Sequence, residues 1–497
     1  MKQKKPTDHP QEVTSLLHCH TQDGISRRDF FDAAGKYAVR GLTAAGIVHS
    51  LGPSYAVAGP VSQSAQIRNL TSEIAVFTVG ARYEAMPSKA VEWAKIAILD
   101  CLGVTLAGSR EDSSRICALQ AREERAKEET TVYGHGFRSS AVQAAFVNGI
   151  GAHATDFDHS FVIGGQPTAP IIPAVFALGE SLGVSGKQVL EAYVTGVEVA
   201  TKLLFASQGT GGGVPHAALG AAIGCAKLLG LKEPEIEKTL GITMTMAGGI
   251  RFDAGTMTKP LSVGLAARTG VLACRMGKGG FTAGKPELPP FDTLGQVYSL
   301  EKYGVRLKPY PCGGLTHAAI YATIQLRNQH AITGDMVEHI DVAVPQGTAN
   351  TIAYRIPETG LQGKFCMGYL VARALIDGKL MLDAFTDAAV RDTQVLGLVE
   401  KVEMRVDPGL PSSSSTDGSR PATITIKLKS GQTHQLYQRF PKGSPQVPMT
   451  PDELKEKFRA CARGIISEAS SERAISYVGS LETMNNIRPL TELLRGT

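Results

Sequence analysis

The stretch "AVEWAKIAILDCLGVTLAG", residues 90–108, indicates how most of this chain folds. Its apolar side chains recur at steps of three and four residues, at Val91, Ala94, Ile98, Leu102 and Leu106. This spacing places them along one face of an α-helix. Similar patterns, separated by glycines, continue from Pro87 to about Leu231, so we expect a set of helices that pack against one another.

A second helical stretch, "SGKQVLEAYVTGVEVATKLL" at 185–204, begins with a serine that can cap the helix. Its small residues Ala192, Gly196 and Ala200 lie four residues apart and allow another helix to approach closely. The simplest interpretation of this stretch is core packing.

The composition supports a helical fold. The chain has 497 residues, 43% of them hydrophobic but only 6% aromatic, with 54 glycines, which favours small aliphatic cores on packed helices. A net charge of +5 is spread along the chain without a long basic block. Nucleic acid is therefore not an expected partner, whereas small anionic ligands are.

The pattern changes after about Val305. Segments 339–345, 399–407 and 421–438 alternate apolar and polar residues, as half-buried strands do, and "LKSGQT" supplies a turn. From Thr450 the chain returns to helix, with a threonine cap and proline at the first helical position. We predict a discontinuous helical domain (69–303 and 441–497) and a smaller α+β domain (304–440).

The first 58 residues have the order of a bacterial twin-arginine export signal. Arg27 and Arg28 precede a weakly apolar stretch at 38–51 and a small-residue site ending at Ala58. That stretch is shorter than the ~20 residues that span a bilayer, and Arg40 interrupts it, so no permanent membrane anchor is expected. We predict a periplasmic protein; the alternative is a cytoplasmic protein that keeps this extension.

The eight cysteines include no CxxC pair and no zinc-ligand spacing. Neither a metal site nor a disulfide framework is predicted, and buried thiols are expected, Cys312 included. No glycine-rich loop stands where a nucleotide would bind, so no cofactor is predicted.

Four segments combine titratable residues with glycine or proline: "HATDFDHSF" (153–161), "GTMTKPLSVG" (255–264), "RLKPYPCGGLTH" (306–317) and "GKFCMGY" (363–369). Proline follows both Lys259 and Lys308, which disfavours helical geometry at each lysine. We expect both lysines in extended or turn segments. Within the first segment, His153 and Asp158 are expected to support the turn.

Together with "PKGSPQVPMTPDELKEKF", these segments resemble the MmgE/PrpD family, which includes 2-methylcitrate dehydratase, cis-aconitate decarboxylase and iminodisuccinate epimerase. The resemblance spans roughly residues 70 to 480. It implies a mainly α fold, with a large helical domain and a smaller α+β lid, a site between the two, and a homodimer.

Carried over by motif, the resemblance places Asp156, Ser160, Lys259, Lys308 and Tyr369 in the active site. The chemistry is plausible in its own right. Removing a proton beside a carboxylate needs a base, and cations or a hydroxyl must stabilise the enolate-like charge that develops. Neither a metal nor a cofactor is required.

The chain departs from the family where the lyases carry histidines, with Gln166, Gly211 and Ser262 at these positions. Glutamine does not titrate near neutrality, so Gln166 cannot transfer a proton and, like Ser262, is expected to bind substrate with the two lysines. His159 and His216 are candidate replacements for the missing imidazoles.

The leading hypothesis is a cofactor-independent lyase, of dehydratase or decarboxylase type, acting on a small hydroxylated or unsaturated polycarboxylate. An isomerase or epimerase on the same scaffold is the alternative, since it needs proton transfer without a leaving group. A periplasmic carboxylate-binding protein without catalytic activity is the third possibility.

Overall fold

The computed structural model describes residues 69–161, 165–207, 215–247, 255–291, 293–352, 354–411 and 418–496. The predicted export signal at 1–58 and Gly211 lie outside these residues. The chain divides into Met1–Ile67 and a compact unit, Arg68–Thr497, which contains every element described below.

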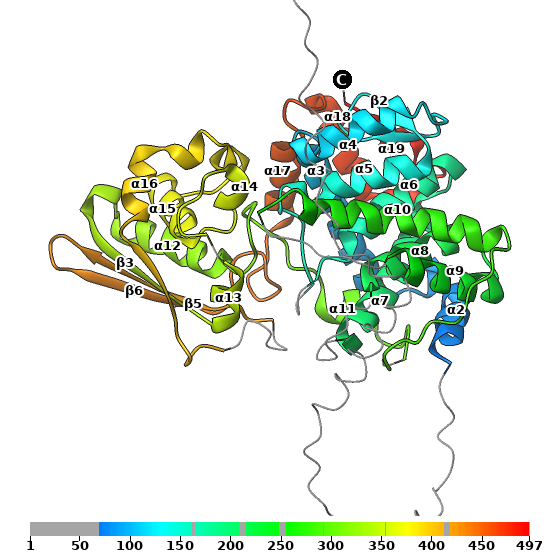
Figure 1. The fold of residues 1–497 in the computed structure, drawn as a ribbon, viewed down its shortest axis with the longest axis horizontal. Helices are drawn as coiled ribbons and strands as arrows, with labels where there is room; N and C mark the ends of the chain where they lie inside the picture. Colours follow the sequence, from blue (N-terminus) through cyan, green and yellow to red (C-terminus); the bar gives the residue numbers. More distant parts are fainter. Residues whose placement is uncertain are drawn as a thin grey trace, which may run out of the picture. The chain divides into compact units, whose positions relative to one another are not determined.

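Most of this unit is helical, as predicted. We call its larger part the helical lobe; its elements come from both ends of the unit (Figure 1). They are α2 (Leu70–Gly80), η1 (Tyr83–Ala85), α3 (Ser88–Gly108), α4 (Asp112–Glu123), β1 (Thr130–Val132), β2 (Phe137–Ser139), α5 (Ala141–Ala154), α6 (Thr168–Leu182), α7 (Gly186–Ser207), α8 (His216–Leu228), α9 (Glu233–Met246), α10 (Thr258–Lys278), α11 (Ser299–Tyr303), α17 (Pro451–Ala462), α18 (Glu468–Gly479), η5 (Leu481–Thr483) and α19 (Arg488–Leu493).

Helix α3 covers the stretch with the three- and four-residue apolar pattern, and its apolar face is buried as expected. It packs against α5 on one side and against the C-terminal helix α17 on another. Helix α17 starts as its sequence predicts: Thr450 caps it, Pro451 stands at its first position, and Glu453 completes a capping box. Leu454 and Phe458 join the core formed by the N-terminal helices.

Helices α7 and α8 approach each other closely at the small residues named above. A side chain on Gly196 would lie 2.5 Å from the Gly220 carbonyl oxygen, and one on Gly220 would lie 2.7 Å from Ala200 Cβ. Such distances leave no room for a larger residue. As the small residues of α7 allow, another helix, α8, packs closely against it.

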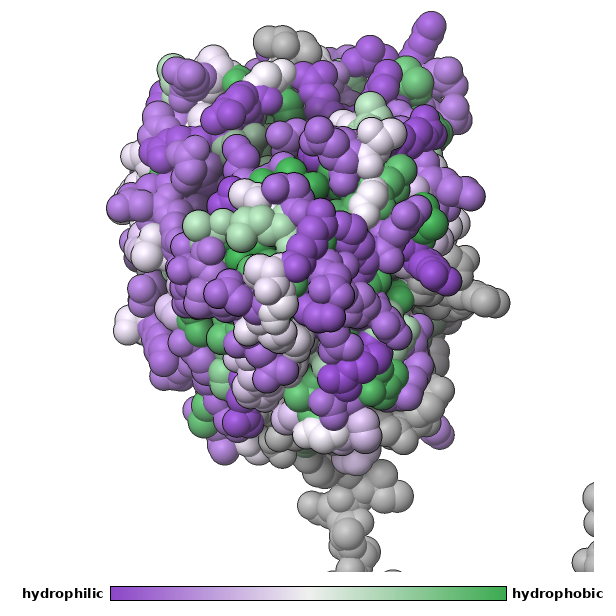
Figure 2. Space-filling view, turned by 90° about the vertical axis from the view of Figure 1, so that its left-hand side faces the viewer, coloured by the Kyte–Doolittle hydropathy of each residue, from purple (hydrophilic) through white to green (hydrophobic). Residues whose placement is uncertain are grey.

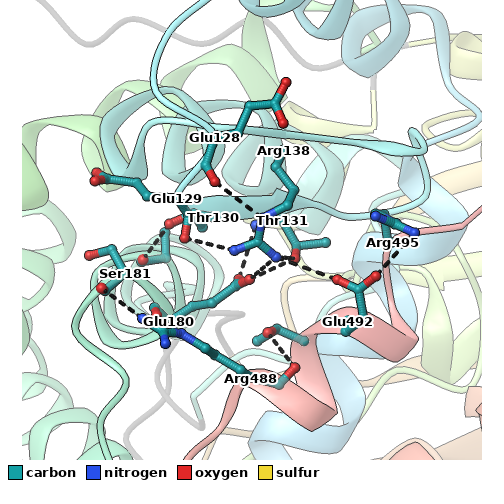
Figure 3. A network of polar contacts seen from close by, with 12 residues as sticks. Glu128, Glu129, Thr130, Thr131, Arg138, Glu180, Ser181, Arg488, Glu492 and Arg495 are labelled. Carbon is teal, nitrogen blue, oxygen red and sulfur yellow. Dashed lines mark hydrogen bonds and ion pairs between the residues drawn. The ribbon is translucent and has the colours of Figure 1, made fainter.

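A buried carboxylate ties three parts of the helical lobe together (Figure 3). Glu180 of α6 is fully buried, accepts a hydrogen bond from the Thr131 hydroxyl at 2.7 Å, and lies 2.8 Å from Arg138 Nη1. Arg488, at the start of α19, donates to the Glu180 backbone carbonyl at 3.0 Å. The β1–β2 hairpin, which the sequence analysis missed, is thereby fastened to α6 and α19.

The second part, which we call the α+β lobe, is formed by the middle of the chain. Its elements are α12 (His317–His330), η2 (Gly334–Met336), β3 (Val337–Val344), α13 (Gln346–Thr351), α14 (Gly360–Gly363), α15 (Met367–Asp377), η3 (Leu382–Phe385), η4 (Ala389–Arg391), α16 (Thr393–Val399), β4 (Val402–Val406), β5 (Ala422–Leu428) and β6 (Thr433–Gln438). The three predicted strand segments correspond to β3, to β4 and to the β5–β6 hairpin.

The strands form one sheet in the order β4-β3-β5-β6. Strands β3 and β4 are parallel, and the other neighbouring pairs are antiparallel. Helices α12 and α15 pack against the sheet, and the alternate residues Ala422, Ile424, Ile426 and Leu428 of β5 are buried in the core they share. The face of the molecule in Figure 2 is largely hydrophilic, with apolar side chains scattered over it.

Two further predictions concern membrane helices and thiols. Within the described residues, no helix has both the length and the apolar character needed to cross a membrane.

The cysteines in this part of the chain are free, and all except Cys117 are buried. Burial raises the pKa of the Cys312 thiol to about 12, so this residue is a buried thiol as predicted and a poor nucleophile.

Candidate active site

Asp156 follows the end of α5 in a strained backbone conformation. Helix α5 ends at Ala154, and Asp156 has a φ of 52°, in the left-handed region that residues with a Cβ rarely occupy. The residue is 4% exposed, and its Oδ2 atom is buried without a hydrogen-bond partner. Backbone strain of this kind is often concentrated at functional sites.

Two lysines from distant segments meet at the other oxygen of this carboxylate. Lys259 Nζ lies 2.8 Å from Asp156 Oδ1, and Lys308 Nζ lies 2.7 Å from the same atom. Lys308 also donates to the backbone carbonyl of Asp156 at 2.8 Å. The structure therefore brings together the three charged residues that the motifs placed in one site.

The charged groups of this centre shift one another's pKa values. Burial by itself would raise the pKa of Asp156, but Lys259, Lys308 and His153 overcome this effect and hold the pKa well below its usual range. Burial would likewise lower the pKa of Lys308, but Asp156 raises it. At neutral pH this centre holds an ionised carboxylate between two ammonium groups.

The predicted extended or turn backbone is confirmed for Lys308 and is wrong for Lys259. Lys308 lies in an irregular segment before α12. Lys259, by contrast, is in the first turn of α10, with Pro260 immediately after it. Proline is tolerated there because the first amide groups of a helix have no partner within it. The first turn of α10, rather than an extended loop, therefore positions the Lys259 ammonium.

His153 and Asp158 form a second buried pair beside Asp156, which agrees with a role in supporting the turn. His153 Nδ1 lies 2.9 Å from Asp158 Oδ1. These two residues and Asp156 each offer an atom within 4.8 Å of the others, a spacing that metal sites also show. Because two ammonium groups already contact Asp156, the charge around these residues favours an anion over a metal cation.

The sequence analysis missed a third lysine. Lys364 is 2% exposed and donates to the Thr155 carbonyl at 2.7 Å, one residue before Asp156. Burial lowers its pKa, as does the nearby Lys259, although Glu111 and Asp156 act in the opposite direction. Lys364 belongs to the "GKFCMGY" segment, which the sequence analysis singled out. From that segment, however, only Tyr369 was assigned to the active site.

Tyr369 lies in α15, with its ring in the core of the α+β lobe. Its hydroxyl donates a hydrogen bond to the Ala384 carbonyl, and its ring packs against Phe385. These contacts of Tyr369 are with its own lobe, and a catalytic role for its hydroxyl stays a prediction.

Ser160 is held by backbone hydrogen bonds, and a catalytic role for its hydroxyl stays a prediction. Its N–H donates to the Arg306 carbonyl at 3.0 Å, and the Arg306 N–H donates back to the Ser160 carbonyl at 2.7 Å. This pair of hydrogen bonds fixes the chain two residues before Lys308. Ser160 is itself 7% exposed.

His159 lies against the helical lobe. Its Nδ1 is 2.8 Å from Asp100 Oδ2 on α3, and Lys457 of α17 contacts the other oxygen of Asp100 at 2.6 Å. His159 is 1% exposed, and its Nε2 is buried without a hydrogen-bond partner. The contacts that fix the imidazole are therefore with α3, and a catalytic role for His159 stays a prediction.

The other predicted residues lie near the ends of helices. His216 begins α8, and a side chain on Gly165 would lie 3.7 Å from its Nε2, so His216 stands beside the turn that contains Gln166. The Ser262 hydroxyl donates to the Lys259 carbonyl at 2.8 Å within α10. The roles of His216, Gln166 and Ser262 in substrate binding or catalysis stay predictions.

The comparisons with known proteins agree with this architecture. Residues 72–302 match the MmgE/PrpD N-terminal domain, and residues 310–483 match the MmgE/PrpD C-terminal domain. The chain is 27% identical over 468 residues to the cis-aconitate decarboxylase of Mus musculus, covering 86% of this chain and 94% of that protein. It is 26% identical to the cis-aconitate decarboxylases of Homo sapiens and of Aspergillus terreus, with 86% of this chain and 95% and 96% of those proteins covered.

These relatives are lyases of the decarboxylase type, as their names state. The two domain matches together account for most of the described chain. The chain belongs to the MmgE/PrpD family.

Proposed function

We propose that this protein is a lyase that removes carbon dioxide or water from a small polycarboxylate, with cis-aconitate as the first substrate to test. The observation that carries the proposal is the convergence of Lys259 and Lys308 on one oxygen of Asp156. Two fixed ammonium groups can hold a carboxylate and stabilise negative charge that develops next to it. The relatives named cis-aconitate decarboxylase support this choice of substrate.

Decarboxylation of cis-aconitate balances without an oxidant or a cofactor. The bond to the departing carboxylate breaks, and its electron pair forms a new carbon–carbon double bond. The electrons of the original double bond move to the next carbon, which takes up a proton. The enzyme must therefore supply one proton donor and cations beside the carbon that receives the charge.

Asp156 is better suited to hold the lysines than to take a proton. A carboxyl whose pKa is well below its usual range stays ionised and is a weak base. Its unpartnered Oδ2 is free to accept a hydrogen bond from the substrate. We therefore assign Asp156 to positioning the two ammonium groups and to contacting the substrate.

Two neighbouring groups are candidates for proton transfer. The first is His153, whose imidazole is oriented by Asp158 in the way that a carboxylate orients a catalytic histidine. The second is Lys364, whose lowered pKa makes the ammonium a better acid than an ordinary lysine. Either one compensates for Gln166, which cannot titrate.

The test is to incubate the purified protein separately with cis-aconitate, 2-methylcitrate and citrate in deuterated buffer and to follow each by NMR. Release of carbon dioxide or loss of water supports the lyase. Deuterium entering an otherwise unchanged skeleton identifies the isomerase alternative, and binding without any exchange identifies the binding protein. If no substrate changes and none binds, the proposal is wrong.

A pair of matched variants assigns the activity to this site. Lys259→Met removes an ammonium from Asp156 and is expected to abolish turnover. Arg405→Gln removes an equal charge from an exposed ion pair with Asp341 and is expected to leave turnover unchanged. Equal activity of the two variants would remove Lys259 from the mechanism.

We also propose that the protein is exported and forms a homodimer. The arginine pair and the small-residue site at 56–58 support export, and the family resemblance supports the dimer. N-terminal sequencing of protein recovered from the periplasm tests export, because cleavage is expected after Ala58. Light scattering tests the dimer, since it measures mass in solution directly.

A further inference from the structure

Arg420 lies just before β5 and has no ion-pair partner among the described residues. Its side chain is partly buried, and its Nε atom lies out of solvent without a hydrogen-bond partner. Among the described residues no carboxylate forms an ion pair with it, and burial lowers its pKa. A partly buried guanidinium with no anion among the described residues is unfavourable, and an anion bound beside it would offset this cost.

Gly314 lies between this guanidinium and the active-site lysine. A side-chain carbon built on Gly314 would lie 3.6 Å from Arg420 Nη1 and 3.8 Å from Lys308 Cε, with no other atom of the described residues within 4 Å apart from its chain neighbours. A carbon at this position would therefore be in ordinary van der Waals contact with both side chains, so Arg420 and Lys308 border the same position. The loop that contains Gly314 also contacts the segment of Lys364, because the Gly313 N–H donates to the Lys364 carbonyl at 3.0 Å.

Within the part of the chain that the structure describes, the positive charge around this position is only partly balanced, even with Asp158 acting on Lys308 and Glu111 acting on Lys364. Asp156 neutralises part of the charge of Lys259 and Lys308. Lys364 donates to a backbone carbonyl, and Arg420 pairs with no carboxylate of the described residues. A substrate with a single carboxylate would leave positive charge uncompensated, whereas a di- or tricarboxylate would compensate it.

We infer that Arg420, together with Lys308 across Gly314, binds a second carboxylate of the substrate and so selects polycarboxylates. This inference rests on the proposed function and adds a specificity-determining residue to it. A guanidinium suits this task because its planar donors can hold a carboxylate with two parallel hydrogen bonds.

The test uses unreactive ligands that differ by one carboxylate. Propane-1,2,3-tricarboxylate is compared by calorimetry with glutarate, which lacks the central carboxylate, and with methylsuccinate, which lacks a terminal one. Arg420→Gln is expected to weaken tricarboxylate binding roughly 10- to 100-fold, the range for loss of a charged hydrogen bond. It should leave the affinity for one of the two dicarboxylates nearly unchanged, which identifies the carboxylate that Arg420 binds.

Three further variants control the result. Arg420→Lys keeps the charge but not the paired donors and should lose less affinity than Arg420→Gln. Gly314→Ala should also weaken tricarboxylate binding while melting like the wild type, because its added carbon makes only ordinary contacts. Arg405→Gln serves as the control for loss of a positive charge. Without ligand, Arg420→Gln should melt no lower than the wild type, since it removes an unpaired enclosed charge.

The outcomes separate this inference from the proposed function. If the wild type binds the tricarboxylate and Arg420→Gln binds it equally well, the Arg420 subsite is wrong and the proposed function stands. An equal loss for all three ligands would also overturn the subsite, because it would show a general effect of charge. If the wild type binds none of the ligands, the proposed function fails, and the subsite fails with it.

Discussion

Lys308 and Asp156 are 152 residues apart in the chain, yet Lys308 Nζ donates both to Asp156 Oδ1 and to the Asp156 backbone carbonyl. One ammonium thus holds the side chain and the main chain of the same residue. Because the φ of Asp156 is positive, the backbone contact also helps to stabilise a conformation that is unfavourable by itself. The pair is therefore a structural clamp as well as a part of the site.

We expect Lys308→Met to destabilise the protein by about 3 kcal/mol, because it leaves a buried carboxylate with one ammonium in place of two. Urea denaturation measures this loss. Lys427→Met is the matched control, since Lys427 pairs with Glu338 on the exposed side of the sheet and should lose less than about 1 kcal/mol. Equal losses in the two variants would show that the Lys308–Asp156 pair does not act as a clamp.

Acid should destabilise the protein through His317, which lies at the start of α12 and is 2% exposed. Burial and the nearby Lys308 lower its pKa from 6.5 to about 3. Between these values the unfolded chain binds a proton that the folded protein excludes. The contribution of His317 to stability is therefore complete above pH 6.5 and declines as the pH falls towards 3.

The slope from this one proton approaches about 1.4 kcal/mol per pH unit. His317→Gln should flatten the plot of unfolding free energy against pH across this whole range. His135→Gln should flatten it over a narrower range, because burial lowers the pKa of His135 only to about 4. An unchanged slope in His317→Gln would mean that the folded protein accepts the proton.

The sequence predicted the site well where a motif fixes the backbone. It predicted the site poorly where the direction of a side chain depends on the residue at which a helix begins. Asp156, Lys259 and Lys308 meet as the motifs implied. Lys364 and Tyr369 come from one motif, but α15 begins between them, at Met367. Lys364 consequently reaches Thr155, while Tyr369 points into the core of its own lobe.

In the fold, too, some elements were predicted from the sequence and others were missed. Long periodic stretches predicted α3 and α7, and alternation predicted the strands of the sheet. Strands β1 and β2 have three residues each, which is too short for a period of two to be recognised. What fixes them is the contact of Thr131 and Arg138 with Glu180, a long-range relationship that no local pattern contains.

Lys364→Met tests the residue that the motif analysis overlooked. We expect it to weaken polycarboxylate binding about tenfold or more, because a buried ammonium next to the site is lost. Calorimetry with propane-1,2,3-tricarboxylate measures the change. The unliganded protein should lose little stability, since burial already disfavours this charge. A large loss of stability with unchanged affinity would make Lys364 a purely structural residue.

The close approach of α7 and α8 leads to a pair of glycine variants with opposite expected effects. In Gly196→Ala the new carbon would lie 2.5 Å from the Gly220 carbonyl oxygen, so the helices must separate, at about 1–3 kcal/mol. In Gly397→Ala, within α16, the new carbon has nothing within 4 Å, and replacing glycine inside a helix should stabilise the protein by about 0.5–1 kcal/mol. Urea denaturation of both variants separates packing from helix propensity. If Gly196→Ala also gained stability, α7 and α8 would have room between them, and the small residues at 192, 196 and 200 would need another explanation.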